Sequence, residues 1–103
     1  MTRAPVVIVR THLVPPRASA WVPVPRRVLV RPQHATDERL IAHELQHVLQ
    51  HERIGRAFLL VYVWQWVRVG FRYRAIPLEV EARRAESEPS MRAWAAELIR
   101  GSP

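Results

Sequence analysis

The sequence predicts an α+β protein in which a small N-terminal β-sheet is followed by a helical half. Three short valine-rich runs, with prolines between or beside them, occupy the first third of the 103 residues. From residue 36 onward the apolar residues recur at helical spacing instead. The length and the 49% content of hydrophobic residues indicate one globular domain spanning residues 1–103.

The predicted strands cover residues 5–10 (PVVIVR), 20–24 (AWVPV) and 27–31 (RVLVR). Pro23 and Pro25 have no backbone N–H group that could be donated to a neighbouring strand. We therefore expect the middle run to form an edge strand or an irregular strand.

Local signals delimit two of the four predicted helices. Thr36 or Asp37 can cap the first helix with a side-chain oxygen, and Gly55 is placed to end it. Pro77 is well placed as the first residue of the third helix, because a helix needs no N–H donor at that position. The last helix, within residues 87–101, is amphipathic.

The second helix, from about residue 56 to residue 72, is apolar nearly all round. This pattern predicts a buried central helix, with one of Trp64 and Trp66 inside the domain and the other nearer the surface. An alternative is a surface that contacts a partner or a membrane. No membrane span is expected, because the apolar run from residue 57 to residue 67 is far shorter than the roughly 20 residues that cross a bilayer.

The chain contains no cysteine, which excludes disulfides, thiolate metal ligands and a cysteine nucleophile. The N-terminal apolar run, Val6 to Val9, is too short for a secretory signal. Together these features favour a reducing, cytoplasmic location.

All sixteen positively charged side chains are arginines, and the formal net charge is +7. Such a balance favours acidic partners, for example nucleic acid or anionic surfaces. The arginines are scattered, however, and adjacent pairs occur only at residues 26–27 and 83–84. We therefore expect a solvated basic surface that binds nucleic acid weakly at most.

The most informative stretch is HELQH at residues 43–47, in the first helix. On a wheel of about 100° per residue, His43 and His47 project from one side on consecutive turns. The opposite side carries the residues expected to face the core, which are Ile41, Leu45, Val48 and Leu49. Two imidazoles aimed at one point suit a single metal ion. The alternative is two solvent-facing histidines on an ordinary helix.

Each part of this motif has a chemical role in metal-assisted hydrolysis. His43 and His47 would supply neutral nitrogen ligands to Zn²⁺, with one ion per chain. Glu44 would act first as general base and then as general acid. It would take a proton from the water that zinc activates and pass that proton to the leaving amine.

The other three histidines are weaker candidates. His51 continues the stripe, but it lies about 12 Å along the helix axis from His43, which is too far for both to bind one ion. We expect His51 on the surface or in support of a ligand. His12 and His34 have no evident partner in the sequence.

A third protein ligand is needed if one zinc position is to stay open for water. Glu79 and Glu81, at the start of the third helix, are the first acidic residues after the motif helix. If the second helix runs back along the first as a hairpin, either glutamate can approach the histidines. The alternative explanation, which must hold for at least one of the pair, is favourable negative charge at a helix N-terminus. If neither glutamate binds the metal, His34 and Glu86 are the next candidate ligands.

With the stretch PLEVEA at residues 77–82 after the motif helix, the chain resembles the gluzincin metallopeptidases, in particular the small single-domain minigluzincins. The resemblance covers residues 37–86. It implies a zincin-like fold, a zinc-dependent peptidase that acts on peptides or proteins, and an edge strand that aligns extended substrate. It also implies Glu79 as the third ligand, with Glu81 as the fallback. The position of the aspartate that supports a histidine ligand in related peptidases holds Arg83.

Tyr73, just before the glutamate helix, can stabilise an oxyanion from there, and packing within the turn is the alternative role. The competing function for the whole chain is non-catalytic: a metal-stabilised adaptor, or a basic nucleic-acid-binding module, on a zincin scaffold. Such a protein would need the histidines but not Glu44. The intact motif therefore favours the hydrolase.

Overall fold

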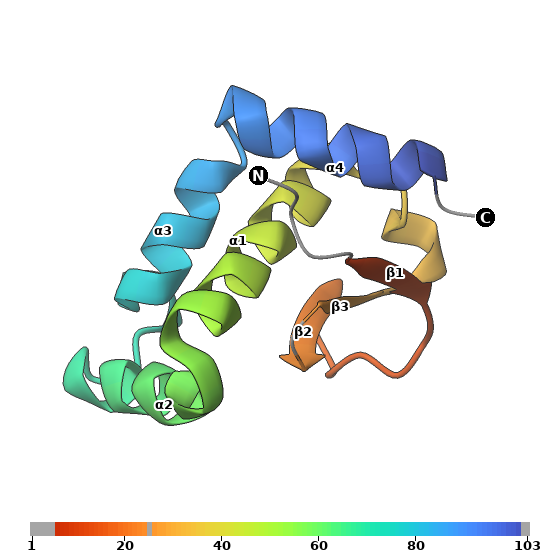
Figure 1. Ribbon diagram of the computed structural model, residues 1–103. Helices are drawn as coiled ribbons and strands as arrows, with labels where there is room; N and C mark the ends of the chain where they lie inside the picture. The colour runs from red at the N-terminus through yellow and green to blue at the C-terminus, as the bar shows by residue number, and fades with distance from the viewer. Residues whose placement is uncertain (1–5, 25, 102–103) are drawn as a thin grey trace.

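The α+β architecture is confirmed by the computed structural model, which describes residues 6–24 and 26–101 (Figure 1). The strands in this part of the chain are β1 (Val7–Arg10), β2 (Ala20–Val24) and β3 (Arg27–Val30). The helices that follow are α1 (Glu38–Ile54), α2 (Phe58–Arg68), α3 (Pro77–Ala85) and α4 (Pro89–Gly101). Pro5, at the start of the first predicted strand, and Pro25 lie outside the described residues.

The sheet has the strand order β1-β3-β2, with β1 parallel and β2 antiparallel to β3. The central strand β3 contributes Val28 and Val30 to the core, both 0% exposed. β2 pairs on one side only, and its register shifts between Trp21 and Val24. Pro23, which has no N–H group to donate, lies within this shift. The prediction of an irregular edge strand is therefore confirmed.

Helix α1 is the centre of the fold and packs against the sheet, α3 and α4 (Figure 1). Asp37 caps it, because one carboxylate oxygen accepts hydrogen bonds from the backbone N–H groups of Arg39 and Leu40. At the other end Gly55 has a φ of 78°, a conformation that residues with a Cβ atom rarely adopt. The predicted core face of the helix is buried through Ile41, Leu45, Val48 and, in part, Leu49.

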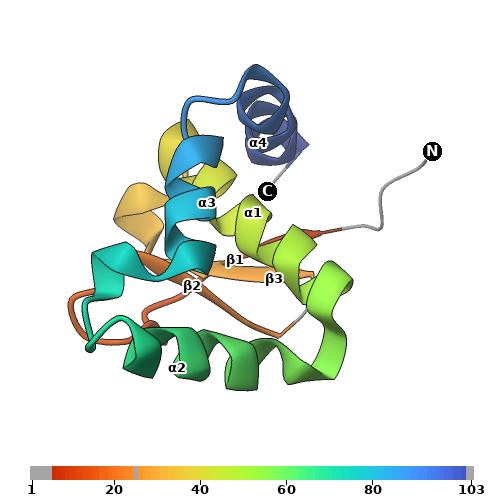
Figure 2. The same cartoon turned by 90° about the vertical axis from the view of Figure 1, so that its left-hand side faces the viewer.

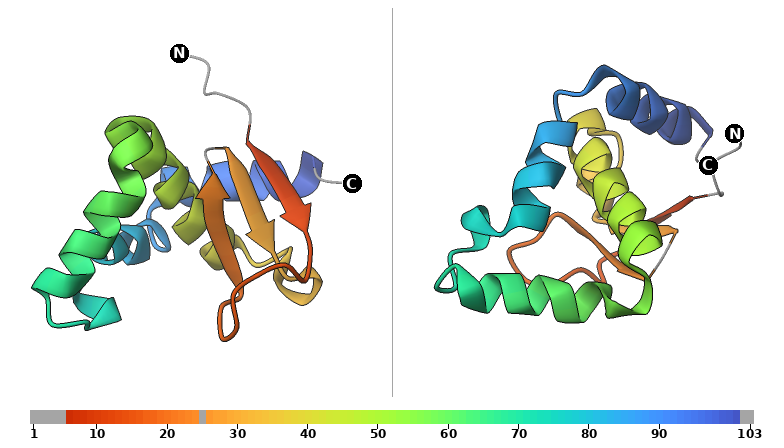
Figure 3. Two further views of the ribbon diagram at one scale, coloured as in Figure 1. Left: turned by 90° about the horizontal axis from the view of Figure 1, so that it is seen from below. Right: turned by 60° about the vertical axis from the view of Figure 1, so that its left-hand side comes forward.

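Helix α3 lies beside α1, and α4 begins beyond the end of α3 and crosses α1 (Figures 1 and 3). α3 begins at Pro77 as predicted and buries one face, formed by Leu78, Ala82 and Ala85. Two of these three side chains are alanines, so little bulk separates α3 from its neighbour. The first turn of α3 is thereby held next to the middle of α1.

The prediction of a buried central helix is wrong for α2. Among its residues only Phe58 is buried, and both tryptophans are exposed, Trp64 by 59% and Trp66 by 39%. α2 does not run back along α1 either; it crosses the C-terminal end of α1 at the edge of the molecule (Figure 2). The physical reason is that α1 already occupies the centre, and α2 covers only a small cluster of Phe58, Ile76 and Leu78. None of the helices in the described ranges combines the length and the apolar content that crossing a bilayer requires.

Candidate metal centre

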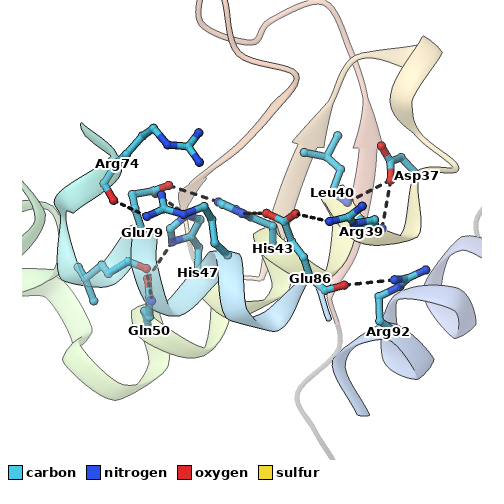
Figure 4. A network of polar contacts seen from close by, with 12 residues as sticks. Asp37, Arg39, Leu40, His43, His47, Gln50, Arg74, Glu79, Glu86 and Arg92 are labelled. Carbon is cyan, nitrogen blue, oxygen red and sulfur yellow. Dashed lines mark hydrogen bonds and ion pairs between the residues drawn. The ribbon is translucent and has the colours of Figure 1, made fainter. Parts of the chain in front are cut away.

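Three side chains from α1 and α3 meet at one point (Figure 4). His43 and His47 lie four residues apart on α1, and Glu79 lies in the first turn of α3. The Nε2 atom of His47 is 2.7 Å from Glu79 Oε1, and the Nε2 atom of His43 is 3.3 Å from Glu79 Oε2. The three residues each offer one ligand atom, and these atoms all lie within 4.8 Å of one another. The arrangement could hold a metal ion.

The donor set fits a zinc ion of the catalytic type, which takes three nitrogen or oxygen ligands from the protein. Both Nε2 atoms face the Glu79 carboxylate, while each Nδ1 atom is bonded elsewhere. The contact from His43 lacks hydrogen-bond geometry, so the buried Oε2 atom of Glu79 has no hydrogen-bond donor among the described residues. A buried carboxylate oxygen without a donor is costly, and a cation at this point would complete its coordination.

The ring of His43 is oriented by Glu86, at the end of α3. Its Nδ1–H group donates to Glu86 Oε2 at 2.8 Å, which leaves Nε2 for a metal. Arg39 lies 3.7 Å from the other carboxylate oxygen of Glu86. Glu86 therefore supplies the support that Arg83 cannot, while Arg83 itself donates to the Arg74 carbonyl. Although it was a reserve candidate for the third ligand, Glu86 binds the far side of the imidazole.

The ring of His47 is oriented by Gln50, which is fully buried three residues later on α1. The amide oxygen of Gln50 accepts from His47 Nδ1–H at 2.8 Å. The amide nitrogen of Gln50 donates to the Leu78 carbonyl and to Glu81 Oε1, each at 2.9 Å. Glu81 also pairs with Arg53 at 3.2 Å. Glu81, the fallback ligand, thus lies outside the cluster and fixes Gln50 instead.

The three ionisable groups of the cluster shift one another's pKa values in the direction that favours protonated histidines around a charged carboxylate. Burial would lower the pKa of His43, but the contacts with Glu79 and Glu86 outweigh it and raise the pKa to about 9. Burial would lower the pKa of His47 too, but the hydrogen bond to Glu79 outweighs the effect of burial, so this pKa is also raised. For Glu79, burial would raise the pKa, yet the two histidines hold it well below its usual range. A divalent cation that binds here must displace these protons.

Glu44 lies beside the cluster on α1 and is 5% exposed. Burial raises the pKa of its carboxyl group, against the opposing charges of the two neighbouring histidines. Its Oε2 atom has no hydrogen-bond partner among the described residues. A carboxylate with a raised pKa and an unpartnered oxygen is suited to taking up a proton.

A cleft of about 280 Å³ opens at the cluster. Glu44, His47 and Glu79 contribute to its lining. Three consecutive residues of β2, from residue 20 to residue 22, also line it, so the unpaired edge of that strand borders the cleft. Further lining comes from α2 and the turn after it, through Phe58, Leu59, Tyr62 and Tyr73.

Two phenol groups lie at the cleft. The Tyr62 hydroxyl donates to Glu79 Oε1 across 3.4 Å. Burial, followed by the neighbouring Glu79 carboxylate, raises the pKa of both Tyr62 and Tyr73, so both hydroxyls remain donors. Tyr73 thus lines the cleft, and so does Tyr62, which was not among the residues predicted from the sequence. Its spacing of four residues from Phe58, on the inner face of α2, is the signal that could have found it.

His51 is not a surface residue. It is 9% exposed, its ring lies over Phe58 with the ring centroids 3.8 Å apart, and its Nε2–H group donates to the Val22 carbonyl. It therefore ties the edge strand β2 to α1 beside the cleft. His12 is exposed and His34 ends a 3₁₀ turn, and neither belongs to the ligand cluster.

Comparison of the chain with protein-family models, with curated proteins and with solved structures found no match. Function is therefore inferred from the residues of the centre and their geometry.

Proposed function

We propose that the protein is a zinc-dependent peptide hydrolase, with His43, His47 and Glu79 as zinc ligands. Glu44 is the proposed general base and acid. The observation that carries the proposal is the position of Glu44, a buried carboxylate with an unpartnered oxygen beside three metal-ligating side chains. A purely structural zinc site would need its ligands but no further buried carboxylate at this point.

A zinc ion held by these residues would lower the pKa of a water molecule to about 7 and polarise the carbonyl group of a bound peptide. Glu44 would accept a proton from that water and later donate it to the nitrogen of the leaving amine. Tyr62 and Tyr73 are the donors that can stabilise the carbonyl oxygen as negative charge develops on it. Gln50 and Glu86 would hold the two imidazole rings in the orientation that presents Nε2.

The proposed substrate is an extended segment of a peptide or protein. The unpaired edge of β2 borders the cleft, and its backbone groups, apart from the Val22 carbonyl that accepts from His51, can pair with an added strand. Such pairing recognises the main chain and so favours unfolded segments of many sequences. Apolar side chains beside it, including Trp21, Val22 and Phe58, offer contact to substrate side chains.

Metal analysis and one conservative substitution test the proposal. Chelator-treated protein should take up about one zinc ion per chain. Glu44→Gln should retain the zinc and lose at least ~10²-fold in the rate of casein hydrolysis, because an amide cannot accept the proton. Glu52→Gln is the matched control, since it changes an exposed glutamate of the same helix. Failure to bind zinc, or unchanged turnover in Glu44→Gln, would overturn the hydrolase.

The non-catalytic alternatives give different results in the same experiments. A metal-stabilised adaptor would bind zinc and hydrolyse no peptide. A basic nucleic-acid module, which the net charge of +7 would suit, should bind nucleic acid with an affinity that falls steeply as salt rises. We expect only weak binding, lost near physiological salt, because the arginines are scattered along the chain.

A further inference from the structure

Helix α2 exposes a continuous apolar stripe to solvent. The stripe, called here the outer face of α2, consists of Leu59, Leu60, Val63, Trp64 and Val67. The other four lie one, four, five and eight residues after Leu59, which places all five on one side of the helix. Leu60 is 75% exposed and Trp64 is 59% exposed. Such a patch of large apolar side chains is uncommon on a protein surface and marks a contact site.

The fold leaves this face exposed, although Leu59 at its border also lines the cleft. α2 contacts the rest of the protein through its other side, where Phe58, Val61 and Tyr62 reach the small cluster at Ile76 and Leu78. Figure 2 shows α2 along one border of the molecule, and the right-hand view in Figure 3 shows the same arrangement. A helix at the border of a globular protein ordinarily turns polar residues outward. α2 is therefore apolar on two sides, of which only one is covered within the described residues.

The segment of chain that carries the outer face has positively charged side chains and no negatively charged ones. Between Glu52 and Glu79 the sequence contains no acidic residue. The same segment contains five arginines, placed before and after the apolar stripe: Arg53, Arg56, Arg68, Arg72 and Arg74. The guanidinium carbon of Arg68 lies 5.1 Å from the centre of the Trp64 ring, so charge and apolar surface adjoin directly.

This charge distribution discriminates between possible occupants. Two copies of the chain that met through α2 would bring their arginines together with no acidic residue in the segment to pair them. The occupant must instead be apolar in its interior and negative at its rim. A lipid surface has this structure, with acyl chains below a layer of phosphate groups. Tryptophan and arginine are the side chains suited to that boundary, and α2 offers Trp64, Trp66 and Arg68.

We propose that the outer face of α2 binds the surface of an anionic lipid bilayer. The helix lies in the plane of the surface, with Leu60, Val63 and Trp64 inserted among the acyl chains and the arginines among the phosphates. Binding does not require zinc or hydrolysis, because no member of the ligand cluster belongs to this face.

Co-sedimentation of the full chain with lipid vesicles tests this inference. The protein should bind vesicles that contain phosphatidylglycerol much more strongly than vesicles of phosphatidylcholine alone, and added salt should weaken the binding. The double variant Leu60→Gln with Trp64→Gln should lose at least ~10-fold in partitioning, because two large apolar side chains no longer insert. Leu13→Gln is the matched control, since Leu13 is 79% exposed but lies outside α2.

A second pair of variants tests the charges. Arg68→Gln with Arg72→Gln should weaken binding to anionic vesicles by roughly fivefold per charge. Arg100→Gln, at the end of α4, should have a smaller effect. Far-ultraviolet circular dichroism should show unchanged helix content in every variant, and Glu44→Gln and zinc-free protein should bind vesicles like the parent chain.

Two results would overturn the inference. One is equal partitioning of the parent chain, Leu13→Gln and the Leu60/Trp64 double variant. The other is absence of vesicle binding together with self-association in sedimentation velocity that the double variant abolishes, which would assign the face to a protein contact.

Discussion

Helices α1 and α2 follow one another in the chain, joined by a single 3₁₀ turn, but they distribute polar and apolar side chains in opposite ways. α1 buries Glu44, His47 and Gln50, whereas α2 exposes Leu60 and Trp64. Buried polar groups and exposed large apolar groups both depart from the usual partition, and both are informative for that reason. On α1 most of the buried polar atoms are paired, and the unpaired Glu44 oxygen adjoins the candidate metal centre. On α2 the departure lies instead in the large apolar side chains that point outward to solvent.

The largest expected effect is on stability, where the two helices should differ most. Leu45→Ala in α1 should reduce the free energy of unfolding by about 2–5 kcal/mol, because Leu45 is fully buried. Leu60→Ala in α2 should change it by less than about 0.5 kcal/mol, because the side chain is largely exposed. Urea unfolding of both variants measures the difference. Equal losses would mean that α2 is packed inside the domain after all.

Zinc affinity should separate two carboxylates of α3. Glu79→Ala should weaken zinc binding by more than the ~10–100-fold typical of residues that only support a ligand. Glu81→Ala should cost at most ~10-fold, because Glu81 acts on His47 only through Gln50. Competition with a chromophoric chelator gives both values. Loss of zinc in the Glu81 variant alone would shift the ligand assignment by two residues, and retention in both variants would place the third ligand elsewhere.

A smaller loss of zinc affinity is expected when the support of His43 is removed. Glu86→Ala leaves Nδ1 of His43 without its acceptor and should weaken zinc binding by ~10–100-fold. Glu97→Ala, which removes an exposed glutamate from α4, is the control. If both variants bind zinc equally well, the contact between Glu86 and His43 does not orient a metal ligand.

The pH dependence should have opposite signs for zinc binding and for the stability of the chelator-treated protein. His43 is protonated below its pKa of about 9, so zinc must displace that proton and its apparent affinity should rise with pH, by up to ~10-fold per unit. The raised pKa stabilises the chelator-treated fold fully below the unfolded value of about 6.5. That contribution is lost as the pH rises from there through about 9. Zinc titrations and thermal unfolding across this range measure the two trends, and parallel trends would contradict the proton assignment.

The parts of the fold that the sequence predicted well are those with local causes. Asp37 begins α1 with a side-chain cap, and Gly55 ends it with a positive φ. Both causes can be recognised from the local sequence. Pro77 opens α3 for a similar reason. The spacing of His43 and His47 is also local, because four residues make one helical turn. Zinc binding and hydrolysis themselves stay predictions.

The parts that the sequence did not predict depend on how elements dock. The sequence of α2 shows that the helix is apolar nearly all round. It does not show how many other elements are available to cover the helix, and this small domain covers only one of its sides. Glu86 was missed as the partner of His43 because their contact depends on how α3 lies beside α1. The contact between Gln50 and His47 could have been predicted from the sequence, because Gln50 lies on the same helix three residues after His47.

The order of the candidate ligands along the chain has a topological consequence. His43 lies before α2 and Glu79 lies after it, so a zinc ion on both would close the intervening polypeptide into a ring that contains the whole of α2. Closing such a ring removes conformations from the unfolded chain. A protease that cut the exposed turn after α2 would then open the ring without releasing a fragment, because the metal would still join the two pieces. In such a protein the backbone could be cut in the outward-facing part of the chain, at the turn after α2, while the metal centre stays assembled.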